Sequence, residues 1–237
     1  MRPTLPWQRY LFLAAATAWR YRACGHFVHG FVLGKLRHDP VYRELLEILD
    51  GGEDGRIVDL GCGQGIAMAL LATAAVLGSS PGRRSPAPQL CGVECGPQAA
   101  AVARAALAGA AEIATGDVRA YRIPGCRAVL LIDLLYHLEP EAQLALLGQA
   151  RAALEPGGLL ILREADAGGG WRFALTWLAE WLRNLGRGRP WRRRYYRTLE
   201  AWRETLSGLG FAVDARPMSQ GTPFANYLLV ARLERIE

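Results

Sequence analysis

The chain has 237 residues, 51% of them hydrophobic, which is enough for one α/β domain, or one and a half, with a sizeable core. Its formal charge is +6, and Lys35 is the only lysine. The excess of arginine accompanies many Ala and Gly residues, a composition typical of a GC-rich coding sequence. The positive charge is therefore weak evidence for a polyanionic partner. The five cysteines form no C-x-x-C pair, which leaves a zinc ion short of ligands and favours free thiols in a reducing cytoplasm.

The segment ahead of the first glycine-rich motif, residues 1–50, is predicted to be helical. Six residues recur at spacings of three and four and predict one helical face: Trp7, Tyr10, Leu11, Ala14, Ala18 and Tyr21. Asp39 is a candidate N-cap with Pro40 at the first position of a following helix. We expect this segment to cap the active site; an extension that only packs on the sheet is an equal alternative.

Two features of the same segment favour no further role. The apolar run 11–18 is at the short limit for a signal peptide and too short to span a bilayer, which favours a protein that is not exported. His26, His29 and His38 have no carboxylate or cysteine beside them. They are therefore interpreted as polar surface residues rather than metal ligands, and no metal site is predicted.

The stretch 56–65, RIVDLGCGQG, organises the chain. Ile57, Val58 and Leu60 predict a short buried strand, and a helix is predicted from Ile66. Glycines between a strand and a helix permit a tight turn, let a ligand approach the backbone, and direct the first helical N–H groups at it. The sequence therefore predicts a site for a small polar ligand.

Two common phosphate-binding loops fit this stretch poorly. A dinucleotide site requires G-x-G-x-x-G, but Ile66 occupies the third glycine position, and no Gly-Lys-Ser/Thr of a P-loop follows. The pattern D-x-G-x-G-x-G instead resembles the first motif of class I S-adenosylmethionine (SAM) dependent methyltransferases. The resemblance implies SAM as the cofactor, held by Asp59, Gly61, Cys62, Gly63 and Gly65.

Later strands add acidic residues to this predicted site. Glu94 ends the predicted strand 90–96, where a carboxylate can accept both ribose hydroxyls, and Cys95 follows it. By resemblance, Asp117 binds the adenine amino group and the Val118 backbone binds the ring edge; a simple Gly-Asp turn is the alternative for Asp117. Asp133, where the predicted strand 128–138 gives way to a loop, is expected beside the methyl donor.

The motif at Asp133, D-x-L-Y-H-L, is similar to that of small-molecule O- and C-methyltransferases and differs from the N/D-P-P-Y/F motif of enzymes that methylate nucleic-acid bases. Nucleic acid is thus a less favoured partner. Removing a proton from a phenolic acceptor calls for a base that titrates near neutrality, so His137 is the candidate, with Tyr136 and Glu164 as substitutes. Arg163, Glu164 and Asp166 are interpreted as groups that bind substrate or anchor a lid.

Residues 168–197 form an Arg- and Trp-rich segment, predicted to begin with a helix. Three interpretations remain open: a solvated basic face with aromatic residues packed inward, a docking patch for an acidic protein or an anionic membrane, and a nucleic-acid contact. A final strand is predicted over 226–233, and a final antiparallel strand is implied by the resemblance. The predicted fold is a Rossmann-like seven-stranded α/β sheet, with residues 51–237 as the SAM-binding domain.

The flanking segments KLRHDPVYRELL, READ with WRF, and GTPFANYLLVAR look similar to a bacterial subgroup of methyltransferases associated with aryl polyene or polyketide-like pathways. That resemblance implies a hydroxyaryl or acyl acceptor, either free or attached to an acidic acyl carrier protein that the arginines would contact. An RNA-modifying enzyme that uses the same donor is the alternative. The acceptor, the atom that is methylated and the oligomeric state are not determined by the sequence.

Overall fold

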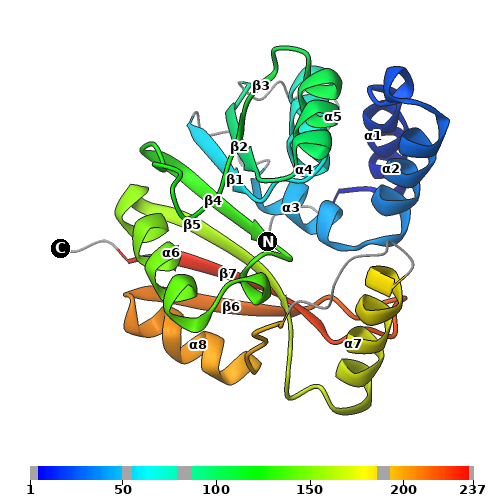
Figure 1. Cartoon of the computed structure of the whole chain (residues 1–237). Helices are drawn as coiled ribbons and strands as arrows, with labels where there is room; N and C mark the ends of the chain where they lie inside the picture. The colour runs from blue at the N-terminus through cyan, green and yellow to red at the C-terminus, as the bar shows by residue number, and fades with distance from the viewer. Residues whose placement is uncertain (1–4, 50–54, 79–86, 186–192, 235–237) are drawn as a thin grey trace. The chain divides into compact units, whose positions relative to one another are not determined.

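The computed structural model describes residues 5–49, 55–78, 87–185 and 193–234. The chain divides into two compact units, residues 1–122 and 123–237, which are described in turn (Figure 1). Within the described ranges, seven strands form a sheet in the order β3-β2-β1-β4-β5-β7-β6. This arrangement confirms the predicted seven-stranded, Rossmann-like α/β fold.

The first unit consists of helices followed by alternating strands and helices. Its elements are α1 (Trp7–Trp19), η1 (Arg22–Cys24), α2 (His26–His38), α3 (Val41–Leu49), β1 (Arg56–Leu60), α4 (Ile66–Leu77), β2 (Gln89–Glu94), α5 (Pro97–Leu107) and β3 (Ala111–Thr115). Strand β2 pairs in parallel with both β1 and β3. Helix α4 is buried over most of its length because α1, α3 and α5 all pack against it, which explains its almost wholly apolar sequence.

The helical N-terminal segment is confirmed, but its buried face differs in part from the prediction. Tyr10, Ala14, Ala18 and Tyr21 are buried as expected. Trp7 is 49% exposed, whereas Leu13 and Thr17 complete the buried stripe. The stripe is displaced because α1 packs against both α2, which lies alongside it in Figure 1, and α4.

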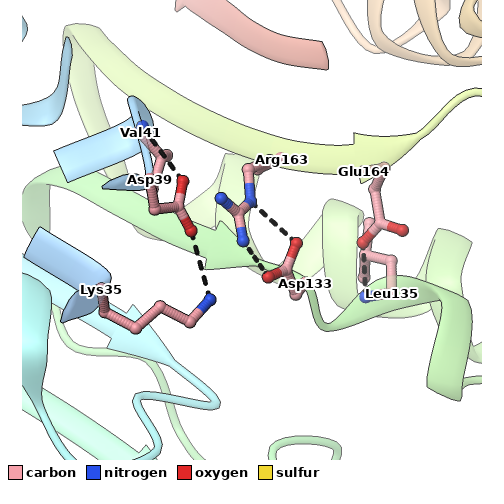
Figure 2. Close-up of polar contacts among 7 residues, drawn as sticks. All are labelled: Lys35, Asp39, Val41, Asp133, Leu135, Arg163 and Glu164. Carbon is pink, nitrogen blue, oxygen red and sulfur yellow. Dashed lines mark hydrogen bonds and ion pairs between the residues drawn. The ribbon is translucent and has the colours of Figure 1, made fainter. Parts of the chain in front are cut away.

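The predicted capping contact of the third helix is present, but α3 begins at Val41 and not at Pro40 as predicted. The Val41 N–H donates to Asp39 Oδ1 at 3.3 Å, and Lys35 pairs with the other carboxylate oxygen of Asp39 at 3.2 Å (Figure 2). A carboxylate at a helix N-terminus satisfies a backbone donor that lacks an intrahelical partner and interacts favourably with the helix dipole. Asp39 therefore separates α2 from α3.

The second unit contains the remaining strands and three helices of the described residues. Its elements are β4 (Cys126–Ile132), η2 (Leu135–His137), α6 (Pro140–Ala153), β5 (Leu154–Ala165), α7 (Gly170–Leu185), α8 (Leu199–Gly208), β6 (Phe211–Pro217) and β7 (Asn226–Leu233). Strand β4 pairs in parallel with β5, whereas β7 is antiparallel to both β5 and β6. The predicted antiparallel final strand is therefore confirmed.

The predicted strand 128–138 is too long at its carboxyl end. Strand β4 ends at Ile132, and Leu135–His137 form a 3₁₀ turn. Asp133 has a φ of 56°, a left-handed conformation that extended strands do not use, so the chain leaves the sheet at this residue. The apolar pattern continues beyond the strand because Leu135 is buried from within the turn.

Three further observations concern metals, thiols and membranes. The five cysteines are free thiols. Among the described residues, no group of three His, Cys, Asp or Glu side chains is placed to hold a metal ion. The helices in the described ranges are also too short or too polar to cross a bilayer.

Candidate cofactor and acceptor sites

The glycine loop curls over the carboxyl ends of β1 and β2. Gly61, Gly63 and Gly65 all have positive φ, at 74°, 55° and 73°, and the Gly61 N–H donates to the Val93 carbonyl at 2.8 Å. A Cβ on Gly63 would meet no atom within 4 Å, whereas one on Gly65 would lie 3.1 Å from Ala103 Cβ of α5. Gly63 thus leaves one side of the backbone open to a ligand, and Gly65 permits close approach of α5.

Glu94 is oriented towards this loop from the end of β2. Its Oε2 accepts the Gly63 N–H at 2.9 Å, and its Oε1 accepts the Gly96 N–H at 2.7 Å. Each carboxylate oxygen has a second acceptor site, which is open on Oε2 and is taken on Oε1 only by the weakly donating Cys95 thiol at 3.5 Å, so Glu94 can accept from two hydroxyl groups once that thiol is displaced. An open backbone beside a fixed carboxylate matches the needs of a nucleoside ribose, and the predicted residues therefore fit SAM.

Cys62 and Cys95 flank the loop and the acid, and only Cys62 is buried. Burial, with Asp59 and Glu94 adding their charges, raises the pKa of the Cys62 thiol, and burial followed by the Glu94 charge raises that of Cys95. Both residues therefore remain neutral thiols at pH 7. Cys62 and Cys95 are predicted to contact the cofactor only because they lie beside the glycine loop.

Asp59 is buried within β1, one residue before the strand ends. Burial, with a contribution from the Glu94 carboxylate, raises the pKa of Asp59 to about 7. A folded-state pKa above the unfolded value of about 3.9 means that folding favours the protonated form. The contribution to stability is complete below about pH 4 and is lost as the pH rises through 7.

We expect Asp59→Asn to gain stability relative to the wild-type protein as the pH rises from 4 to 7.5, because the amide carries no charge to desolvate. Thermal unfolding at several pH values measures this difference. Asp214→Asn, at an exposed aspartate in β6, is the matched control and should show no such trend. A constant difference between Asp59→Asn and wild type across this range would contradict the assignment.

Asp117 and Val118 lie directly after β3. The Asp117 carboxylate accepts the Arg119 N–H at 2.9 Å and the Arg119 Nε–H at 2.9 and 3.0 Å, and these bonds lower the Asp117 pKa. Both side chains are exposed, so the pair contributes little stability, and an adenine amine would have to compete with Arg119 for oxygens that already accept four of its bonds. Val118 is buried, which leaves its backbone as the relevant group.

Tyr21 is a residue of this site that sequence reasoning identified only as part of a helical face. Its hydroxyl donates to the Gln64 carbonyl inside the glycine loop at 2.9 Å, and its ring is fully buried. The neighbouring Arg20 donates to Thr73 Oγ1 of α4 at 3.1 Å. The N-terminal helices therefore support the loop directly; the pattern of apolar residues indicated burial but not this hydrogen bond.

In the second unit, Asp133 is paired with Arg163 of β5 (Figure 2). The Arg163 Nε–H donates to Asp133 Oδ1 at 2.8 Å, and Nη2 bonds the other oxygen. The guanidinium is buried whereas Asp133 is partly exposed. The predicted lone acid after β4 thus carries a counter-charge, which sequence reasoning did not foresee.

Glu164, the next residue of β5, is only 2% exposed. Its Oε1 accepts the Leu135 N–H at 2.8 Å, which fixes the turn after β4 (Figure 2). Burial, followed by the Asp133 charge, raises the Glu164 pKa well above its usual range. Glu164 therefore stabilises the turn through this hydrogen bond. To serve as the base, its buried carboxyl would have to become accessible to the acceptor.

Tyr136 and His137 form an aromatic cluster with residues that follow α7. The Tyr136 ring is buried, stacks on Tyr196 at 4.9 Å between centroids, and lies 4.4 Å from the His137 ring. The Arg194 Nη1 atom is 3.1 Å from His137 Nε2. A guanidinium can only donate, so Nε2 is the acceptor in this contact, and the His137 side chain is exposed.

The other described residues of the basic segment also pack on the protein. The Tyr195 N–H donates to the Tyr136 carbonyl at 2.9 Å, and the Arg197 Nε–H donates to Gln143 Oε1 at 2.7 Å. Asp166 accepts the Leu199 N–H at 2.9 Å and so anchors the start of α8. These contacts favour inward packing for residues 194–197, whereas Arg187, Arg189, Trp191 and Arg192 lie outside the described residues.

Comparison with known proteins places the fold in a family. A family model described as a methyltransferase domain matches residues 33–216. A magnesium protoporphyrin IX methyltransferase from Synechocystis, solved with S-adenosylhomocysteine, is 18% identical with a TM-score of 0.59 and 95% and 98% of the two chains covered. A putative methyltransferase from Haloferax volcanii, in complex with the Trm112 activator, is 16% identical with a TM-score of 0.64, covering 93% of this chain and 97% of that one.

An O-methyltransferase family 2 protein from Planctomyces limnophilus, in complex with apigenin, is 18% identical with a TM-score of 0.60. The match covers 81% of this chain and 56% of that longer one. No curated protein sequence matches the chain. The family match covers most of the chain and the loop fits the cofactor, so the chain belongs to the methyltransferase domain family and is a SAM-dependent methyltransferase.

Proposed function

We propose that the protein methylates a small acceptor that carries a hydroxyaryl or acyl group. The observation that carries the proposal is the turn after β4, where the buried Tyr136 stacks on Tyr196 and His137 is exposed beside them. Aromatic rings pack well against a planar acceptor, and an exposed imidazole suits proton transfer near neutral pH. The apigenin complex of a protein with this fold supports the same acceptor class.

In the proposed reaction, bound SAM supplies a methyl group on a sulfonium, which is an activated leaving group. The glycine loop and Glu94 hold the donor, and the residues around Tyr136 align the acceptor and exclude water. A phenol has a pKa of about 10, so removal of its proton accelerates attack. His137 takes that proton on Nε2 after Arg194 releases this atom, and Arg194 then remains close enough to stabilise the phenolate.

We expect His137→Ala to lower kcat by about 10²-fold or more while the SAM dissociation constant stays unchanged, because the base acts only in the chemical step. Turnover is measured with methyl-labelled SAM and a panel of hydroxyaryl acids, both free and as thioesters of an acyl carrier protein. His38→Ala, an exposed histidine of α2, is the control. Wild-type turnover in His137→Ala would exclude His137 as the base. The variants Tyr136→Phe and Glu164→Gln would then test the two substitutes.

An acidic acyl carrier protein is the proposed macromolecular partner in this reaction, and the cytoplasm is its proposed location, in line with the five free thiols. The same panel tests the partner, because a preference for the thioester over the free acid is expected. An RNA substrate is the alternative. It is less favoured because Arg194 and Arg197 engage the protein itself, and binding of mixed tRNA that weakened steeply with salt would revive it.

A further inference from the structure

Helix α7 is attached to the second unit through one of its sides. The Arg172 Nη1 donates to the Thr222 carbonyl at 3.3 Å, and Thr176 Oγ1 accepts the Ala225 N–H at 3.2 Å. Phe173 packs edge-on against Tyr196, with ring centroids 5.1 Å apart. Polar and aromatic contacts of residues spaced one turn apart therefore fix the orientation of the helix.

The opposite side of α7 is an exposed apolar stripe. Trp171, Leu175, Leu178 and Leu182 are spaced by four, three and four residues, and Trp171 and Leu182 are 64% and 52% exposed. Trp181 lies next to this stripe and is also exposed. Leu175 and Leu178 are 37% and 42% exposed, and the Arg172 guanidinium lies 5.1 Å from the centroid of the Trp171 ring. A contiguous exposed apolar patch of this kind indicates a surface that binds a membrane or another molecule.

The charge of the same segment indicates what kind of partner binds the apolar stripe. Residues 168–197 contain eight arginines and a single acidic residue, Glu180. A second copy of this segment would bring two strongly basic surfaces together, which is unfavourable. An acidic protein would satisfy the arginines but would need its own apolar groove for the stripe.

An anionic lipid surface satisfies both features together. An amphipathic helix with Trp and Leu on one face and arginines next to it lies in the plane of a bilayer interface, with its apolar face among the acyl chains and its cations at the headgroups. Tryptophan in particular prefers the interface, and three of the seven tryptophans of the chain lie in α7. A helix of 16 residues extends over about 24 Å, and its axis would run parallel to the surface.

We propose that α7 is a peripheral membrane anchor, which inserts the stripe of Trp171, Leu175, Leu178 and Leu182 into a bilayer that carries anionic lipids. Arg194 and Arg197 contact the protein itself, so the electrostatic attraction comes from the remaining positive charge that the sequence carries in residues 168–197. The proposal concerns where the protein acts and does not depend on the identity of the acceptor.

Vesicle flotation of the full chain tests the anchor. We expect binding to vesicles of phosphatidylcholine with a quarter phosphatidylglycerol, little binding to pure phosphatidylcholine, and weaker binding at 0.5 M salt. The variant Leu178→Ser with Leu182→Ser should partition at least about tenfold more weakly, because two Leu side chains no longer enter the apolar phase. Phe27→Ser, at an 87% exposed phenylalanine of α2, is the matched control and should bind as wild type does.

Three outcomes would overturn the proposal. The first is absence of flotation of the wild-type chain with anionic vesicles. The second is equal binding of the Leu178→Ser, Leu182→Ser variant, which would leave a purely electrostatic contact of the arginines. The third is a change from dimer to monomer in that variant without vesicle binding, which would identify a second copy as the occupant. Unchanged SAM binding by the variant shows that it is folded.

Discussion

Glu94→Ala is expected to raise the SAM dissociation constant by about 100-fold, as measured by calorimetry. The change removes two charged acceptors for the ribose, and hydrogen bonds to a charged group contribute about 1.5 kcal/mol or more each. It also removes the partners of the Gly63 and Gly96 N–H groups, which lie 2.9 and 2.7 Å from the carboxylate oxygens. The loop therefore loses both a ligand contact and part of its own support.

Two variants separate these effects. Glu94→Gln keeps one acceptor oxygen and the shape of the side chain, so we expect an intermediate affinity. Glu112→Ala removes an exposed glutamate of the neighbouring β3 and should bind SAM normally. Normal SAM affinity in Glu94→Ala would mean that the carboxyl end of β2 does not hold the donor, and thermal unfolding of each variant shows whether the fold is retained.

The second large effect concerns stability. Asp133→Ala should destabilise the protein by on the order of 3 kcal/mol, because it leaves the buried Arg163 guanidinium without its counter-charge. For a chain of this size, each kcal/mol corresponds to a shift of roughly 2–4 °C in Tm. We therefore expect a decrease of about 6–12 °C in a thermal scan. Asp133→Asn, which keeps an acceptor oxygen, should lose less.

Asp214→Ala is the matched control for this experiment. Asp214 pairs with Arg216 at 2.9 Å, but both side chains are exposed, and surface pairs contribute between zero and about 1 kcal/mol. A decrease in Tm for Asp133→Ala as small as that for Asp214→Ala would show that Arg163 is stabilised by its other contacts. The comparison isolates burial as the cause, since the two ion pairs have the same chemistry.

Much of the architecture could be predicted from local patterns. The strand at 226–233 and the start of the helix at Ile66 were predicted where the structure shows them, and the strand predicted around Ile57, Val58 and Leu60 spans Arg56–Leu60. Each has a strong signal nearby: a continuous apolar run in the last strand, and glycines that separate the first strand from the helix. The strand at 126–132 was predicted to end six residues too late, at 138, because leucines continue through the turn that Asp133 begins.

The predicted site residues differ in how far the sequence could describe them. The glycine loop is a local motif, and Glu94 was predicted beside it because both follow neighbouring strands; the hydrogen bond between Gly63 and Glu94 itself, across 31 residues, was not predicted. The contacts of Asp133, Glu164 and His137 were not predictable, because each partner lies far away in the chain: Arg163, Leu135 and Arg194. Sequence patterns record periodicity, whereas these pairs depend on strand register and on the path of the segment after α7.

By itself, the sequence determined the family, the cofactor and the order of strands and helices, because these depend on motifs of a few residues and on helical and strand periodicity. Only the tertiary structure decided the charge state around the turn after β4 and the direction that α7 faces. Arg163 neutralises Asp133 because parallel pairing of β4 and β5 sets Ile132 opposite Arg163, next to Asp133. The stripe of α7 points outward because Arg172, Phe173 and Thr176 hold the other side of the helix.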